Sequence, residues 1–203
     1  MSSQALRNFG LKLADARLLI NHAARLRKGT DRQAKTIFLH AALAAQVATW
    51  ESYIKGIARE YFLVTASTAD IRFSAMHALL NALMLEANKK LNTPDSEHAR
   101  TFLLKYTNFD IWPCWVNVKF GNVLLGSVLL ARNRLDEILS IRHSFAHGFT
   151  MPAHAWNTDA SGAPKLTCSI VRNTESFFND LCTKTDVAFG THIATQHSIA
   201  RQW

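Results

Sequence analysis

The chain has 203 residues, of which 48% are hydrophobic, so it can bury a full core and we expect one domain over residues 1–203. The formal net charge of +8 points to a polyanionic partner or a membrane surface, and nucleic acid is the commoner of the two. The apolar run 123–131 is too short to span a membrane, and three scattered cysteines without a CxxC pair favour the reducing cytoplasm over a secreted disulfide framework.

The spacing of apolar residues predicts helices through most of the chain. The first four helices are expected at 4–27, 32–62, 71–91 and, after a break at 92–95, on to 106. Thr93 is expected to cap the fourth helix, with Pro94 at its first helical position. The segment 107–122 has no clear pattern, and residues 122–130 are expected to form a helix or a helical turn.

One long connection interrupts the helical pattern at residues 148–172, which contain two prolines and two glycines. It is longer than a compact bundle needs, so we expect it to be functional or mobile, with 166–171 as a candidate strand. The last helix is expected to start at the cap Asn173 and to end near residue 196. The fold class is therefore an all-α helical bundle with one irregular connection and at most a short β element.

The stretch 136–149 is where we expect the chemistry of this chain. Read as a helix, it places Arg142 in the middle of an apolar stripe. A buried guanidinium needs a partner, because an uncompensated charge in an apolar site is costly. The candidate partners are an acid of the chain, a second subunit and a phosphate. A structural arginine that reaches solvent or meets one carboxylate is the alternative.

Two histidines lie on another face of the same predicted helix. His143 and His147 are four residues apart, and Gly148 is well placed to end the helix. The pair spells HxxxH, which is the spacing of a zinc-binding helix, but Ser144 stands where that motif has its glutamate and no third ligand is obvious. We therefore expect no metal and no other cofactor.

Glu51 is a second charge within an apolar stripe, on the helix predicted at 32–62. It is opposite in sign to Arg142. Two interpretations remain open for Glu51: an ion pair with Lys55, one turn further on, or a buried bridge to Arg142.

The sequence R-H-S-F-A-H-G at 142–148 resembles the R-(polar)-x-x-(A/V)-H-G signature of HEPN domains. Two other R-x4-H arrangements, 17–22 and 72–77, have Leu or Phe after the arginine and lack the Ala and Gly that flank the histidine. Residues 48–54 and 117–124 resemble two further segments of the same branch, the RiboL-PSP-HEPN proteins of toxin and defence systems.

This resemblance implies a helical bundle that forms a homodimer, with the arginine and histidine of both copies lining one cleft. It implies metal-independent cleavage of single-stranded RNA to 2′,3′-cyclic phosphate ends, in which His147 moves a proton, Arg142 holds a phosphate and His143 contacts the substrate. Ser144 and Glu51 would then be supporting or interface residues. An antitoxin or another defence protein is a further implied partner.

Two rival classes of function remain open. A noncatalytic HEPN-like module would bind RNA, a nucleotide or a partner protein with the same helices and charge. A structural helical adaptor would use Arg142 and Glu51 as a buried pair and would need no histidine.

Overall fold

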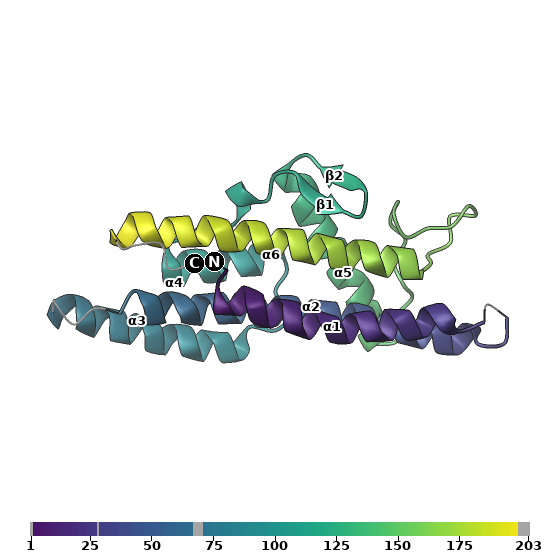
Figure 1. The fold of residues 1–203 in the computed structure, drawn as a ribbon, viewed down its shortest axis with the longest axis horizontal. Coiled ribbons are helices and arrows are strands. Elements are labelled where there is room, and N and C mark those ends of the chain that lie inside the picture. Colours follow the sequence, from purple (N-terminus) through teal and green to yellow (C-terminus); the bar gives the residue numbers. More distant parts are fainter. Residues whose placement is uncertain (1, 28, 67–70, 199–203) are drawn as a thin grey trace.

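The computed structural model describes residues 2–27, 29–66 and 71–198. The regular elements of these residues are six α-helices, one 3-10 turn and one β-hairpin (Figure 1). In chain order they are α1 (Gln4–Arg25), α2 (Arg32–Val64), α3 (Ile71–Lys90), α4 (Ser96–Thr107), η1 (Trp112–Cys114), β1 (Val118–Phe120), β2 (Val123–Leu125), α5 (Val128–Ala146) and α6 (Cys168–His197). The predicted mostly helical bundle is confirmed. None of the described helices is long and apolar enough to cross a membrane.

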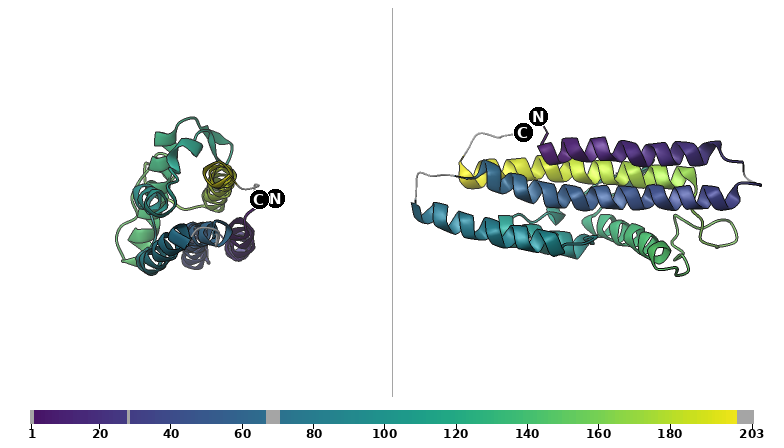
Figure 2. Two further views of the ribbon diagram at one scale, coloured as in Figure 1. Left: turned by 90° about the vertical axis from the view of Figure 1, so that its left-hand side faces the viewer. Right: turned by 90° about the horizontal axis from the view of Figure 1, so that it is seen from below.

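The central element is α2, which contacts every other α-helix of the described part. The long helices α1, α2 and α6 run side by side along the longest axis of the molecule, and α3, α4 and α5 lie along the opposite side of α2 (Figure 2). Because α2 has neighbours on both sides, its buried residues are spread around the helix and do not form one stripe.

Aromatic side chains of α2 anchor the core. Trp50 is fully buried, and its ring centroid lies 6.0 Å from that of Trp115. The indole N–H of Trp50 donates to the carbonyl of Pro94 at 2.9 Å, and the hydroxyl of Tyr53 donates to the carbonyl of Cys182 at 3.0 Å. The polar end of each ring is thus satisfied, as buried Trp and Tyr require.

The start of α4 corrects the prediction that Thr93 caps this helix and that Pro94 is its first residue. Asp95 is the cap, and its carboxylate accepts a hydrogen bond from the backbone N–H of His98 at 2.8 Å. Thr93 has a left-handed φ of 46°, which is not a cap conformation. Aspartate caps well for an added reason, because its negative charge complements the positive end of the helix dipole.

The β-hairpin corrects the helix predicted over 122–130, since residues 123–125 form β2. Phe120 pairs with Val123 across a two-residue turn at 121–122. Gly121 has a φ of 59°, and a Cβ there would lie 2.3 Å from Oδ1 of Asn173 on α6. The turn therefore favours glycine at this position, and a larger residue would also have to displace the side chain of Asn173.

The start of α6 corrects two further expectations, the strand at 166–171 and the cap at Asn173. The helix begins at Cys168, and the hydroxyl of Thr167 accepts from the N–H of Ile170 at 3.2 Å. Threonine and asparagine are both good caps. The earlier start wins because it carries Val171 into a buried cluster with α1 and α2.

Candidate active site

A capped helix end holds the predicted motif. α5 stops at Ala146, His147 is its cap residue, and Gly148 follows with a left-handed φ of 69°. The N–H of Phe149 donates to the carbonyl of Ser144 at 2.8 Å, and the N–H of Gly148 reaches the carbonyl of Phe145 at 3.4 Å. This pair of bonds is the Schellman arrangement that a glycine after the cap makes possible. The expectation that Gly148 ends the helix is confirmed, and the cap fixes the backbone of His147.

The two histidines of the motif lie together at this helix end. The ring centroids of His143 and His147 are 4.2 Å apart, and both residues are exposed. The ring of Phe149 lies 5.9 Å from that of His147 at an angle of 28°. The site thus presents two proton-transfer groups and one exposed aromatic face to solvent.

Arg142 lies within the core-facing side of α5 and is half-buried. None of the described residues forms a hydrogen bond or an ion pair with it. A half-buried guanidinium without an internal partner can bind an anion that comes from outside the chain.

Of the two interpretations left open for Glu51, the ion pair with Lys55 is confirmed and the bridge to Arg142 is not formed. Glu51 instead pairs with Lys55 at 2.6 Å and accepts from the backbone N–H of Thr93 at 2.8 Å. The reason is axial position: the end of α5 meets α2 near His40, about 16 Å along the helix from Glu51. Angular position on a helical wheel carries no information on this separation.

Ser144 faces the interior, with an exposed fraction of only 5%. Its hydroxyl donates to the carbonyl of Ile141 at 2.8 Å. Ser144 therefore packs the helix that carries the motif and does not face solvent with the histidines.

His40 of α2 is a site neighbour that the sequence analysis missed. Its ring stacks on that of Phe145, with centroids 4.3 Å apart and planes 9° from parallel. His40 is buried, burial lowers the pKa of its imidazole, and its Nδ1 has no hydrogen-bond partner in the described part of the chain. An imidazole whose neutral form is favoured by burial thus packs against the helix that carries the motif.

His154 is a second neighbour that was missed, and it belongs to the long connection. Its Nε2 lies 3.2 Å from the hydroxyl of Ser140, and its Nδ1 lies 3.8 Å from a carboxylate oxygen of Glu137. The indole N–H of Trp156 donates to the same carboxylate at 2.7 Å. The connection after α5 therefore folds back and is fastened to α5 one turn before the motif. Ser140 shares a helix face with His143, so His154 stands beside that face.

A comparison with protein-family models identifies the family. The model described as RiboL-PSP-HEPN matches residues 12–190 of this chain. No curated protein and no solved structure matches the chain.

Proposed function

This chain belongs to the RiboL-PSP-HEPN family, and from that premise we propose that it is a metal-independent endoribonuclease that cleaves single-stranded RNA. The observation that carries the proposal is the end of α5, where a half-buried Arg142, without a partner among the described residues, precedes two exposed histidines. The family match over 12–190 also supports one HEPN domain over residues 1–203.

The reaction needs only proton transfer and charge stabilisation. The 2′-oxygen forms a bond to phosphorus as the bond from phosphorus to the 5′-oxygen breaks, one proton leaves the 2′-hydroxyl, and one proton goes to the 5′-oxygen. His147 serves as general base or acid, and the planar fork of Arg142 binds the phosphate oxygens. His143 contacts the substrate next to His147. The products end in a 2′,3′-cyclic phosphate and a 5′-hydroxyl.

The exposed ring of Phe149 is an argument for a single-stranded substrate. Its ring is 65% exposed and nearly parallel to that of His147, so an unstacked base can lie on it. Ser144 supports the site from the interior, because it packs the helix that carries the motif.

A homodimer completes this site in the proposal. Arg142 and His147 point about 140° apart on one helix, which is too divergent for both to grip one phosphate. A second copy across a two-fold axis would supply the missing group from its own α5. Light scattering at micromolar concentration tests this, and a monomer would contradict it.

We assign the activity to the cytoplasm, in a toxin–antitoxin or antiviral defence setting. The three cysteines are unpaired, as a reducing compartment favours. An antitoxin or another defence protein is then the expected protein partner.

The experiment is incubation of the purified protein with single-stranded RNA or DNA of the same sequence in EDTA. We expect cleavage of RNA only, because DNA lacks the 2′-hydroxyl. His147→Ala should lower the rate by roughly 10² to 10⁴, and Arg142→Lys should also be impaired. His98→Ala is the matched control, since this exposed histidine lies on α4.

Three results would contradict the mechanism: cleavage that survives His147→Ala, cleavage that EDTA abolishes, or equal cleavage of DNA. Binding of RNA without any cleavage would favour the noncatalytic HEPN-like module.

A further inference from the structure

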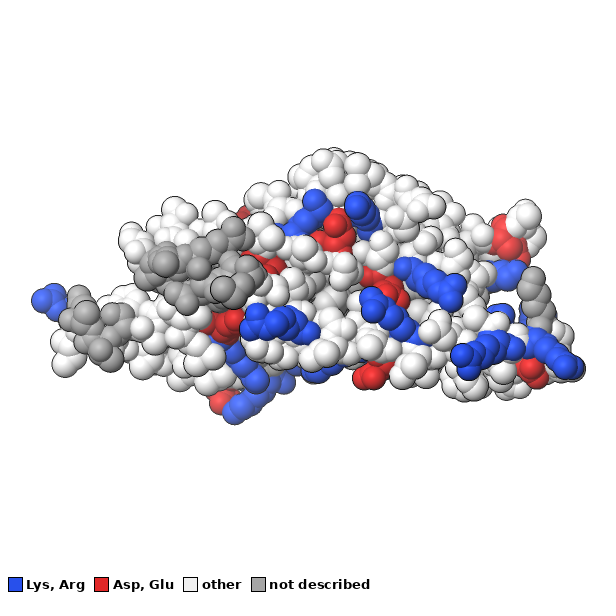
Figure 3. All heavy atoms as spheres, viewed as in Figure 1, with Lys and Arg blue, Asp and Glu red and all other residues white. Residues whose placement is uncertain are grey.

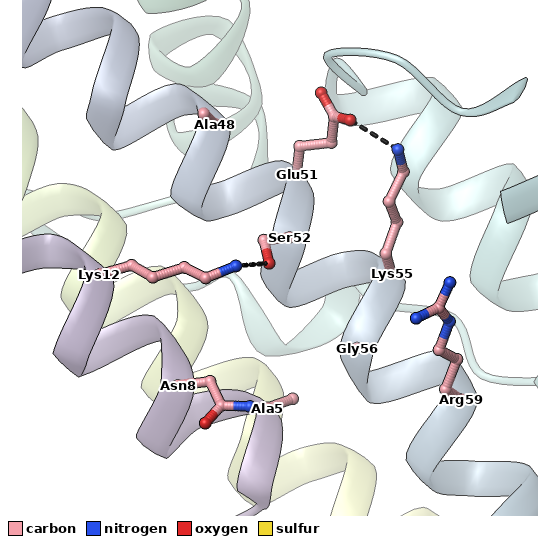
Figure 4. A pocket seen from close by; sticks show the side chains of 9 residues that line it. All are labelled: Ala5, Asn8, Lys12, Ala48, Glu51, Ser52, Lys55, Gly56 and Arg59. Atoms are coloured by element: carbon pink, nitrogen blue, oxygen red, sulfur yellow. Dashed lines mark hydrogen bonds and ion pairs between the residues drawn. The ribbon is translucent and has the colours of Figure 1, made fainter. Parts of the chain in front are cut away.

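A recess of about 450 Å³ opens between α1 and α2, away from the histidines (Figure 4). Small residues make room for it, namely Ala5 on α1 with Ala48 and Gly56 on α2. The two helices nearly touch at one edge, because a Cβ on Gly56 would lie 3.2 Å from the Cβ of Ala5. The recess is therefore a fixed feature of the packing of α1 on α2.

Cationic side chains from both helices rim the recess (Figure 4). The ammonium of Lys12 donates to the neutral hydroxyl of Ser52 at 2.7 Å. Arg59 is exposed and has no hydrogen bond or ion pair with any residue that the structure describes. Lys55 differs from these two, because Glu51 neutralises it at 2.6 Å.

The nearby carboxylates are already engaged. The second oxygen of Glu51 accepts from the N–H of Thr93 at 2.8 Å. The two oxygens of Glu60 accept from the backbone N–H groups of Gln4 and Ala5, at 2.9 and 3.0 Å. Glu51 offsets only the charge of Lys55, so the charges of Lys12 and Arg59 give the recess a net positive charge. Figure 3 shows that basic side chains also follow the outer face of α1 and α6, with acidic ones between them.

We propose that this recess binds a phosphate group, held by Lys12 and Asn8 of α1 and by Arg59 of α2. An arginine fork matches phosphate oxygens in pairs, a lysine adds a point charge, and an amide N–H adds a neutral donor. Among the described residues, none that lines the recess carries an aromatic ring on which a base could stack. The chemistry that is recognised is thus the phosphate itself, whether it comes from an RNA backbone or from a small phosphate ligand.

The site is separate from the motif on α5. The motif on α5 contacts α2 at His40, and Lys55, which lines the recess, lies roughly 22 Å further along the axis of α2. Binding here does not depend on whether the histidines cleave RNA, so the two proposals can fail independently.

Calorimetric titration with pyrophosphate at low ionic strength tests the site. We expect saturable binding to the wild type, weakened about tenfold or more by Lys12→Ala and by Arg59→Ala, the usual effect of losing one charge-assisted contact. Lys90→Ala on α3 and Arg25→Ala at the far end of α1 remove the same charges elsewhere and should leave the affinity within about twofold. Thermal unfolding by circular dichroism checks that all four variants fold.

A second arm identifies the source of the phosphate. Fluorescence anisotropy with 2′-O-methyl RNA, which cannot be cleaved through a 2′-hydroxyl, measures strand binding alone. If Lys12→Ala and Arg59→Ala both weaken RNA binding, and pyrophosphate competes with the RNA, the site binds the RNA backbone. If the two variants bind RNA with unchanged affinity, the site binds a small phosphate ligand. Absence of saturable pyrophosphate binding, or equal weakening by the control variants, would overturn the proposal.

Discussion

A single methyl group at Gly148 tests the geometry of the candidate active site. The φ of Gly148 is 69°, and a Cβ there would meet nothing within 4 Å. Gly148→Ala therefore has no steric clash, and its cost is the left-handed conformation alone, about 1–2 kcal/mol of unfolding free energy. Gly10 is the matched control: it lies inside α1, and its Cβ would also meet nothing within 4 Å. Gly10→Ala should stabilise the protein by about 0.5–1 kcal/mol.

The assay is urea unfolding monitored by circular dichroism, and RNA cleavage is measured on the same protein samples. Gly148→Asn should lose less stability than Gly148→Ala, because asparagine tolerates the left-handed region better. Gly148→Ala should also lower cleavage, since the bonds around Gly148 fix the backbone of His147. Gly10→Ala should leave cleavage unchanged.

The result that would refute this reasoning is a stabilised Gly148→Ala, as for Gly10→Ala. Residue 148 would then continue α5, and His147 would lie inside the helix and not at its cap. Loss of cleavage in such a variant would say nothing about the Schellman arrangement.

Two further predictions concern the histidines that flank the motif. His154→Ala should lower the unfolding free energy by about 1 kcal/mol. The same change made in a Ser140→Ala background should cost less, because the two side chains share one hydrogen bond. If urea unfolding shows that the two losses are purely additive, that contact is contradicted. Burial lowers the pKa of His40, so the folded state favours the neutral ring. The stability that depends on this neutral ring is fully present above the ordinary pKa of 6.5 and is lost as the pH falls towards the pKa in the folded state. His40→Phe keeps a ring against Phe145 and should reduce the loss of stability between about pH 7 and pH 5, and an unchanged slope would contradict this.

Local patterns predicted the helices because the spacing of apolar residues can be counted along the chain. They failed where two local signals compete. Threonine, aspartate and asparagine all cap helices well, so Thr93 competes with Asp95 and Asn173 competes with Thr167, and only Asp95 and Thr167 are the caps. The apolar run 123–131 suits a strand as well as a helix, and its division into β2 and α5 depends on the turn at Gly121 and on the packing of that turn against α6.

Some residues of the candidate site could likewise be placed from local sequence, and others could not. The relative positions of His143, His147 and Gly148 follow from one helix and its cap, so the sequence was enough to predict them. His40 and His154 reach α5 from distant segments, and neither lies in a pattern that specifies this contact. The separation of Glu51 from Arg142 belongs to the same class, because it depends on how α5 is placed along α2.

Arg142 has no partner in the part of the chain that the structure describes, and this links the site to the proposed dimer. Both oxygens of Glu51, the acid predicted to meet it, are occupied by other donors. On the same helix end Phe145 and Phe149 are 45% and 65% exposed, an apolar surface that a second copy would cover. Two copies of α5 across a two-fold axis would also bring two guanidinium groups towards one cleft, where their repulsion opposes association unless an anion lies between them. An RNA phosphate is such an anion, so in the proposed dimer the substrate completes the ion pairs that the protein alone leaves open.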